Sequence, residues 1–186
     1  MDYRLAVLFT VSLPIVLLVW AFFRNMEAIQ RLLIIYWRVS SLLAITVYLM
    51  IGGLRLGFIS GLVARILIPI ALWLWVDLNE EIDDAASTPL KLAFTAWRWA
   101  VSAYCILGVI ATFPFLRCAF SVDFFSQPYC QVWLEAPWRY RDYFHASLTP
   151  GFLGFLGAIG LVIYASCLAY FLLIRFGKQG RSAIQR

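Results

Sequence analysis

Long apolar runs separated by short polar stretches dominate the chain of 186 residues. Each run is close to the roughly 20 residues that an α-helix needs to cross the hydrocarbon core of a membrane. The pattern predicts an all-α, polytopic membrane protein that forms a single membrane domain over residues 1–186. Its five transmembrane helices are expected at residues of about 5–23, 32–51, 58–76, 90–116 and 152–174.

The first run follows a short charged start, which is also typical of a secretory signal peptide. The run is too long for that, however, and it ends in the letters WAFFR without a small-x-small cleavage site. We therefore interpret it as a retained transmembrane helix with a kink at Pro14. Membrane helices tolerate a proline where neighbouring groups satisfy the carbonyl that it frees.

The second and third runs are separated by a short, flexible break with the letters GGLRLG. This leaves a second arrangement open, in which the two runs form a re-entrant pair and the chain crosses the membrane four times. The odd helix count of the five-helix arrangement argues against the inverted-repeat plan of many transporters.

Basic residues lie at the ends of the runs, where Lys and Arg orient and anchor membrane helices. With five helices, the basic residues of 24–38 and of the tail 175–186 fall on the same side. The positive-inside rule then predicts an external amino terminus, an exported loop 117–149 and a cytoplasmic carboxyl terminus. The acidic block 77–84, DLNEEIDD, is expected to be a solvated cytoplasmic loop, with a docking patch for a basic partner or a cation site as the alternative.

The composition agrees with a membrane protein, because 63% of the residues are apolar and 13% are charged. Soluble proteins have about 45–50% and about 25%. The net charge of +5 could indicate nucleic-acid binding, but the basic residues are not gathered on one polar face. We expect no nucleic-acid partner.

The loop 117–149 contains two of the four cysteines and the only histidine. Cys118 and Cys130 share this exported segment, and we expect a structural disulfide that stabilises the fold by about 2–3 kcal/mol. Cys105 and Cys167 lie within helices and are expected to be packing residues. His145 is interpreted as an interface residue, with a pigment or metal ligand as the alternative.

Arg65 and Arg98 lie well inside the third and fourth runs. Charge at such depth costs roughly 2.5–3.5 kcal/mol on insertion scales, so each should contact protein, water or a lipid headgroup. The five runs contain no Asp or Glu, so a loop acid, a carbonyl, a lipid phosphate or another chain must be the partner. We expect Arg98 to snorkel between its neighbouring tryptophans and Arg65 to make an intermolecular or helix-end contact.

The last run opens with glycine at every third position, at Gly151, Gly154, Gly157 and Gly160. Faces of small residues let membrane helices approach closely, and van der Waals packing then drives their association. We expect this face to pack against a partner helix. A flat pigment or quinone on the same smooth face is the alternative.

The sequence shows no Ser-His-acid set, no glycine-rich phosphate loop and no CxxC motif. We therefore expect no catalytic residues, no metal site and no enzyme activity. The sequence requires no cofactor, although chlorophyll, carotenoid or lipid would be compatible with it.

Several segments together resemble an uncharacterised family of small integral membrane proteins found in cyanobacteria, known as a domain of unknown function. They are RLLIIYWRVSSLLAITVYLMIGG, ARILIPIALWLWVDLNEE, LKLAFTAWRWAVSAY, TPGFLGFLG and RFGKQGRSA. The resemblance includes the paired loop cysteines. It implies a thylakoid or plasma membrane, with the exported loop in the lumen or periplasm, and it carries over no catalytic residues.

These features favour a non-catalytic accessory or assembly factor of a larger membrane complex, most plausibly photosynthetic, whose partners are other integral membrane subunits and membrane lipid. The alternative is a small transporter or channel component, in which Arg65 and Arg98 line an anion path.

Overall fold

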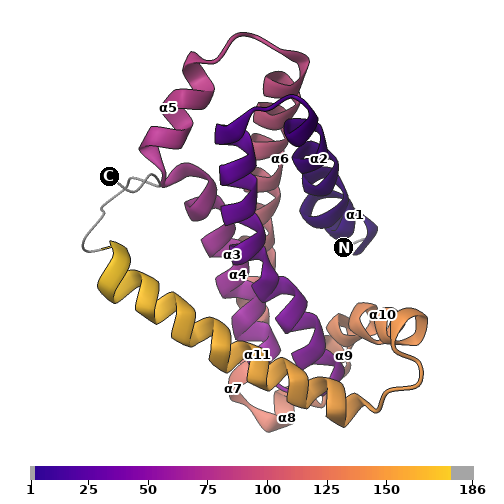
Figure 1. Cartoon of the computed structure of the whole chain (residues 1–186). Helices are drawn as coiled ribbons and strands as arrows, with labels where there is room; N and C mark the ends of the chain where they lie inside the picture. Colours follow the sequence, from indigo (N-terminus) through magenta and orange to yellow (C-terminus); the bar gives the residue numbers. More distant parts are fainter. Residues whose placement is uncertain (1–2, 177–186) are drawn as a thin grey trace. The chain divides into compact units, whose positions relative to one another are not determined.

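The structure is a computed structural model that describes residues 3–176, and all the elements in this range are helices (Figure 1). The longer ones are α2 (Leu13–Phe23), α3 (Glu27–Ile51), α4 (Leu56–Trp73), α5 (Val76–Asp84), α6 (Pro89–Thr112), α10 (Glu135–Phe144) and α11 (Pro150–Tyr170). The shorter ones are α1 (Tyr3–Val7), η1 (Leu8–Ser12), η2 (Phe113–Leu116), α7 (Arg117–Phe120), α8 (Val122–Phe125), α9 (Pro128–Gln131), η3 (Val132–Leu134) and η4 (Phe171–Phe176).

Within the described residues, five stretches are long and apolar enough to span a membrane. They are Leu5–Phe23, Glu27–Ile51, Leu56–Trp73, Pro89–Phe120 and Pro150–Ile174. The predicted all-α fold with five spans is therefore confirmed. The two helices beside the glycine break have 25 and 18 residues, so each reaches the length of a span on its own. Of the predicted tail, residues 177–186 lie outside the described part of the chain.

The helices form two compact units. Of the described residues, unit 1 contains 3–40, Ile66–Leu107 and 170–176. Unit 2 contains Ser41–Arg65 and Gly108–Ala169. The helices α3, α4 and α6 therefore contribute residues to both units.

In unit 1, Pro14 lies within the first span, near the start of α2, and the helix continues through it. A proline removes one backbone N–H, and its ring disturbs the carbonyl four residues earlier. The structure places the widened turn η1 directly before α2, and the Tyr36 hydroxyl donates a hydrogen bond of 2.7 Å to the Thr10 carbonyl. Trp97 donates from Nε1 to the Phe9 carbonyl at 2.9 Å. The Tyr36 and Trp97 side chains thus donate hydrogen bonds to backbone carbonyls in the segment that the proline disturbs.

The turn between α2 and α3 is tighter than the sequence indicated, because α3 begins at Glu27 rather than at Leu32. Asn25 adopts a φ of 52°, a left-handed conformation that commonly ends helices. The first turn of α3 is then supported by an ion pair of 2.7 Å between Glu27 and Arg31, four residues apart. The charged residues of this segment therefore belong to the helix itself.

The α3–α4 turn belongs to unit 2 and depends on glycine. Gly53 has a φ of 68°, and the Leu54 N–H returns to the Leu49 carbonyl at 2.9 Å. Beyond the turn, the buried hydroxyls of Thr46 and Ser60 are 2.9 Å apart and hydrogen-bond across the two helices. Such bonds between membrane helices typically contribute about 0.6 kcal/mol or more.

The acidic block was expected to be a solvated loop, and this was wrong. It forms the helix α5, in which Leu78 and Ile82 are buried. These two residues are four positions apart, so they share one face of a helix and bury it in unit 1 while the carboxylates stay outside. In the sequence, the many acidic residues of this block indicated a loop, and two apolar residues among them were too weak a signal for a helix.

The glycine face of α11 packs against α3 within unit 2. A Cβ atom built on Gly154 would lie 2.7 Å from the Gly52 Cα, and one on Gly157 would lie 2.9 Å from the Leu49 backbone nitrogen. A Cβ on Gly160 would lie 3.3 Å from the Ile45 side chain. Gly151, the first of the four, has open space around it. Three of the predicted glycines therefore serve a contact inside the chain.

This packing predicts that Gly154→Ala and Gly157→Ala destabilise the protein. Each added methyl group would meet backbone, which cannot rotate away, so the helices must separate at a cost of about 1–3 kcal/mol. The matched control is Gly151→Ala, which fills open space and gains up to about 1 kcal/mol of helix propensity. Thermal unfolding of the purified variants in one detergent measures the difference. Equal melting temperatures for Gly151→Ala and Gly154→Ala would contradict the close approach.

Candidate functional site

The most enclosed charged group among the described residues is the guanidinium of Arg98 on α6. Arg98 is 3% exposed and donates a hydrogen bond from Nη1 to the Asn79 side-chain oxygen on α5. Its Cζ atom lies 4.1 Å from the centre of the Trp73 ring, a cation–π contact that contributes up to about 2 kcal/mol when desolvated. Arg98 was expected to snorkel towards solvent, and the structure instead encloses it.

Hydrogen bonds around Arg98 hold the Trp73 ring in place beside the guanidinium. Trp73 donates from Nε1 to the Ser102 hydroxyl at 3.0 Å, and that hydroxyl donates to the Arg98 carbonyl at 2.8 Å. The Asp83 carboxylate interacts electrostatically with the guanidinium, whereas the buried Nε of Arg98 has no hydrogen-bond partner. The charge is therefore stabilised by the Asn79 amide, by the Trp73 and Phe94 rings and by the Asp83 carboxylate.

The helix α5 is fixed over Arg98 by its carboxyl-terminal end. The Lys91 ammonium donates to the Asp83 and Ala85 carbonyls, both at 2.7 Å. A cation at these carbonyls also complements the negative end of the helix dipole. The sequence left a loop acid, a carbonyl, a lipid phosphate or another chain open as the partner of a deep arginine, and in the structure Arg98 contacts Asn79 and Asp83 of the helix α5. Asn79 itself was missed, although it lies in the one polar segment between the two spans.

Arg65 has a different environment, in unit 2. Its Nη1 donates to the Gly61 carbonyl on the same helix at 3.0 Å. Its side chain lies over Gly108 of α6, where an added Cβ would come within 2.9 Å of the Arg65 Cδ. The missing side chain at Gly108 therefore makes room for the arginine. The sequence singled out Arg65 and did not indicate the role of Gly108.

The two loop cysteines lie together as predicted. Cys118 and Cys130 are at disulfide-bonding distance, with Cα atoms 6.0 Å apart, and both are fully buried. They pack against Phe58, which is 8% exposed, and several partly buried aromatic residues surround them. The Phe115 and Tyr129 rings stack at 4.3 Å between their centres. The cysteine pair therefore links the loop to α4. Of the remaining cysteines, Cys105 is buried and Cys167 is exposed.

His145 lies at the end of α10 and packs against two aromatic residues. Its Nε2 and the Tyr48 hydroxyl form a hydrogen bond of 2.8 Å. Its ring centre is 5.6 Å from that of Tyr48 and 5.7 Å from that of Tyr140. Nε2 is one of the two ring nitrogens that could ligate a pigment or metal, and here it hydrogen-bonds a tyrosine of α3.

Among residues 3–176, no group of three or more His, Cys, Asp or Glu side chains could hold a metal ion. The polar groups described above bind one another and the backbone, and this arrangement is typical of groups that position helices in an apolar environment.

The chain matches the model of a known protein family. The model of a family described as "Protein of unknown function (DUF3177)" matches residues 1–184. No curated protein and no solved structure matches the chain.

The Arg98 geometry predicts that Asn79→Leu destabilises the protein by about 1–3 kcal/mol, because a buried charged donor loses its acceptor. Glu80→Leu, at the next and exposed position of α5, is the control. The double variant Asn79→Leu/Arg98→Leu should be more stable than Asn79→Leu alone, since no unpaired charge remains buried. Thermal unfolding in detergent measures all three. If Asn79→Leu is no more harmful than Glu80→Leu, the hydrogen bond does not stabilise the fold.

Proposed function

The chain belongs to the family of proteins of unknown function described as DUF3177, and we propose that it is a non-catalytic accessory subunit or assembly factor of a larger membrane protein complex. Its partners would be the membrane-spanning helices of other subunits, together with membrane lipid.

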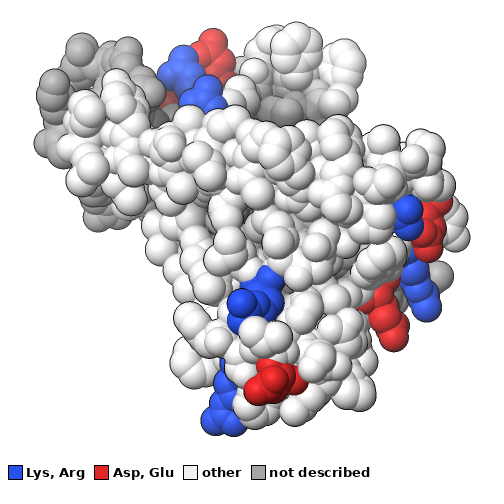
Figure 2. Space-filling model, turned by 90° about the horizontal axis from the view of Figure 1, so that it is seen from below, with Lys and Arg blue, Asp and Glu red and all other residues white. Residues whose placement is uncertain are grey.

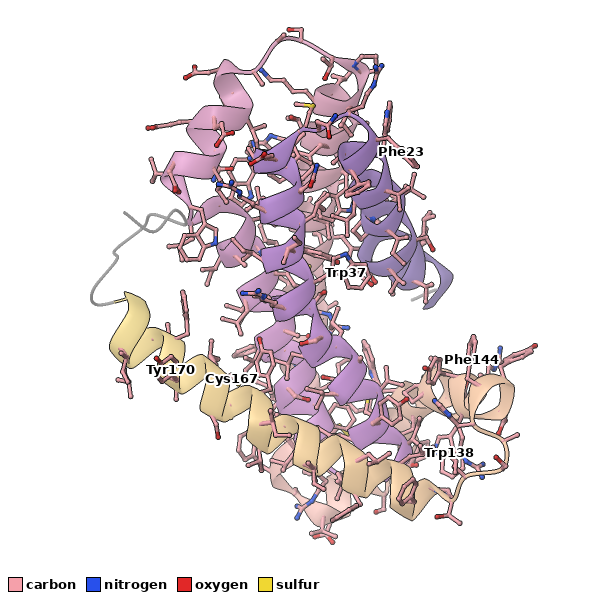
Figure 3. All side chains as sticks on the ribbon, viewed as in Figure 1. Phe23, Trp37, Trp138, Phe144, Cys167 and Tyr170 are labelled. Carbon is pink, nitrogen blue, oxygen red and sulfur yellow. A yellow bond between two sulfur atoms is a disulfide. The ribbon has the colours of Figure 1, made fainter. Side chains whose placement is uncertain are left out.

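The observation that carries this proposal is the outward surface of α11. The buried residues of this helix are Leu153, Gly154 and Gly157, all near its start. Further along, Ser166 and Ala169 are exposed, and the Ser166 hydroxyl donates to the Val162 carbonyl at 2.8 Å. Figure 3 shows Cys167 and Tyr170 on the same part of the helix, where both are exposed.

Small exposed residues favour a second helix over lipid as the neighbour. The small residues Ser166 and Ala169 are three positions apart, so they share one face of α11. On such a face two backbones can approach closely, and van der Waals packing drives the association of helices in lipid. The Ser166 hydroxyl is already satisfied within the helix, so a partner helix covers it without leaving an unpaired donor.

The resemblance to cyanobacterial membrane proteins supports a photosynthetic setting, in a thylakoid or plasma membrane. The basic residues support an amino terminus and a loop 117–149 on the lumenal or periplasmic side, with the carboxyl-terminal tail in the cytoplasm. Buried cysteines at disulfide distance in the loop agree with an oxidising compartment.

The test is co-purification in mild detergent with the variants Ser166→Leu and Ala169→Leu. Both positions are exposed in the single chain, so the variants should keep the melting temperature of the wild type. The added volume should separate a partner helix, and the co-purifying subunits should be lost. Ile163→Leu, an exposed position of nearly equal volume, is the control and should retain them. Unchanged co-purification with Ala169→Leu, or the recovery of further copies of this chain alone, would contradict the proposal.

The orientation is tested on the cysteines of intact spheroplasts, in a Cys167→Ala background that removes the exposed free thiol. An impermeant maleimide should not label the chain until an impermeant reductant opens the bond between Cys118 and Cys130. Labelling without reductant would show that the disulfide is absent. Labelling that requires permeabilised membranes would exclude a periplasmic loop and leave the thylakoid lumen or the cytoplasm.

A further inference from the structure

Loop 117–149 contains a helix, α10, that presents three different sides. Successive residues of an α-helix are turned by about 100°, so residues three or four apart share a side. Pro137 is buried, and the Arg141 side chain is 19% exposed, so their side faces the protein. The other two sides are exposed: Tyr140 and Tyr143 form an aromatic side, which Phe144 extends at its border with the buried side, and Glu135, Arg139 and Asp142 form a charged side.

The aromatic side of α10 exposes an unusual amount of apolar surface. Tyr143 is 84% exposed and Phe144 is 71% exposed. Figure 3 shows Phe144 projecting from this helix. Transfer of apolar surface from water to an apolar environment is favourable by about 25 cal/mol per Å². Burial of this side would therefore be favourable, but no described residue of the chain covers it.

The position of α10 is fixed relative to the ends of two membrane spans within unit 2. Tyr48, in the last turn of α3, hydrogen-bonds His145, and its ring centre is 6.4 Å from that of Tyr140. Arg141 donates from Nε and Nη2 to the Leu148 carbonyl at 3.1 and 2.9 Å, two residues before α11 begins. Since α3 and α11 are both long and apolar enough to span the membrane, α10 lies where their hydrocarbon segments end.

We propose that α10 is an interfacial helix that lies in the headgroup layer of the membrane. Its aromatic side, with Tyr140, Tyr143 and Phe144, inserts between the lipids, and its charged side faces water. The continuity of α10 with the ends of two spans favours lipid over a protein partner. Tyrosine and tryptophan also collect at this depth, because their rings are apolar and their polar atoms remain hydrated.

The charged side of α10 contains both signs, with Glu135 and Asp142 beside Arg139. Attraction to anionic headgroups is therefore weak, and insertion of the aromatic side provides the binding. The helix should consequently insert into membranes of zwitterionic lipid. On the face shown in Figure 2, charged residues gather in a few small groups and most of the surface is uncharged.

The experiment uses the whole chain in phosphatidylcholine vesicles, with nitroxide labels on single cysteines in the Cys167→Ala background. Labels replace Tyr143 or Phe144 on the aromatic side, and Asp142, the matched control, on the charged side. Oxygen concentrates in lipid and a nickel chelate stays in water. The ratio of oxygen to nickel collision rates should be several-fold higher at positions 143 and 144 than at position 142. Each variant must keep the wild-type melting temperature.

Two results would overturn the proposal. Equal access of the nickel chelate to all three positions would show that α10 stands in water. Protection of positions 143 and 144 from both reagents would show that protein covers them, either a second copy or another part of the chain. The vesicles contain no other protein, so the experiment tests only where α10 lies in the membrane. Either result leaves the proposed accessory-subunit function untouched.

Discussion

The structure depends on one constraint, that a polar group carried into an apolar layer is costly unless the protein supplies a partner for it. Arg98 shows this most clearly, because its guanidinium is 3% exposed and is bound by Asn79 and the Trp73 ring. The Thr10 carbonyl, freed by Pro14, is satisfied in the same way by Tyr36. Loss of one such partner costs more than the bond itself contributed, since water cannot replace it.

Close backbone contact is the second interaction that holds the helices together. Lipid chains are as apolar as leucine, so burial of apolar surface does not hold membrane helices together, and packing must do so. The chain meets this requirement with glycine at three contacts: Gly154 against Gly52, Gly157 against Leu49, and Gly108 beneath Arg65. In the last case the glycine also makes room for a charged side chain.

The spans and the proximity of Cys118 and Cys130 could be predicted from sequence, because the spans follow from local composition and the two cysteines are only 12 residues apart. The partner of Arg98 could not, because Asn79 is an ordinary polar residue until α5 folds over α6. The glycine face of α11 was recognised, but the choice between α3 and a foreign helix depends on tertiary packing. The helix α5 was missed because Leu78 and Ile82 are only two apolar residues among many charges.

The order of the paired groups along the chain matters for biosynthesis. Asn79 precedes Arg98 by 19 residues, Thr10 precedes Tyr36 by 26, and Phe9 precedes Trp97 by 88. In each pair the acceptor leaves the ribosome first, and the donor enters the membrane with its acceptor already synthesised. The Arg98 guanidinium, the most costly of these donors to insert, can therefore pair with Asn79 without waiting for any later segment of the chain.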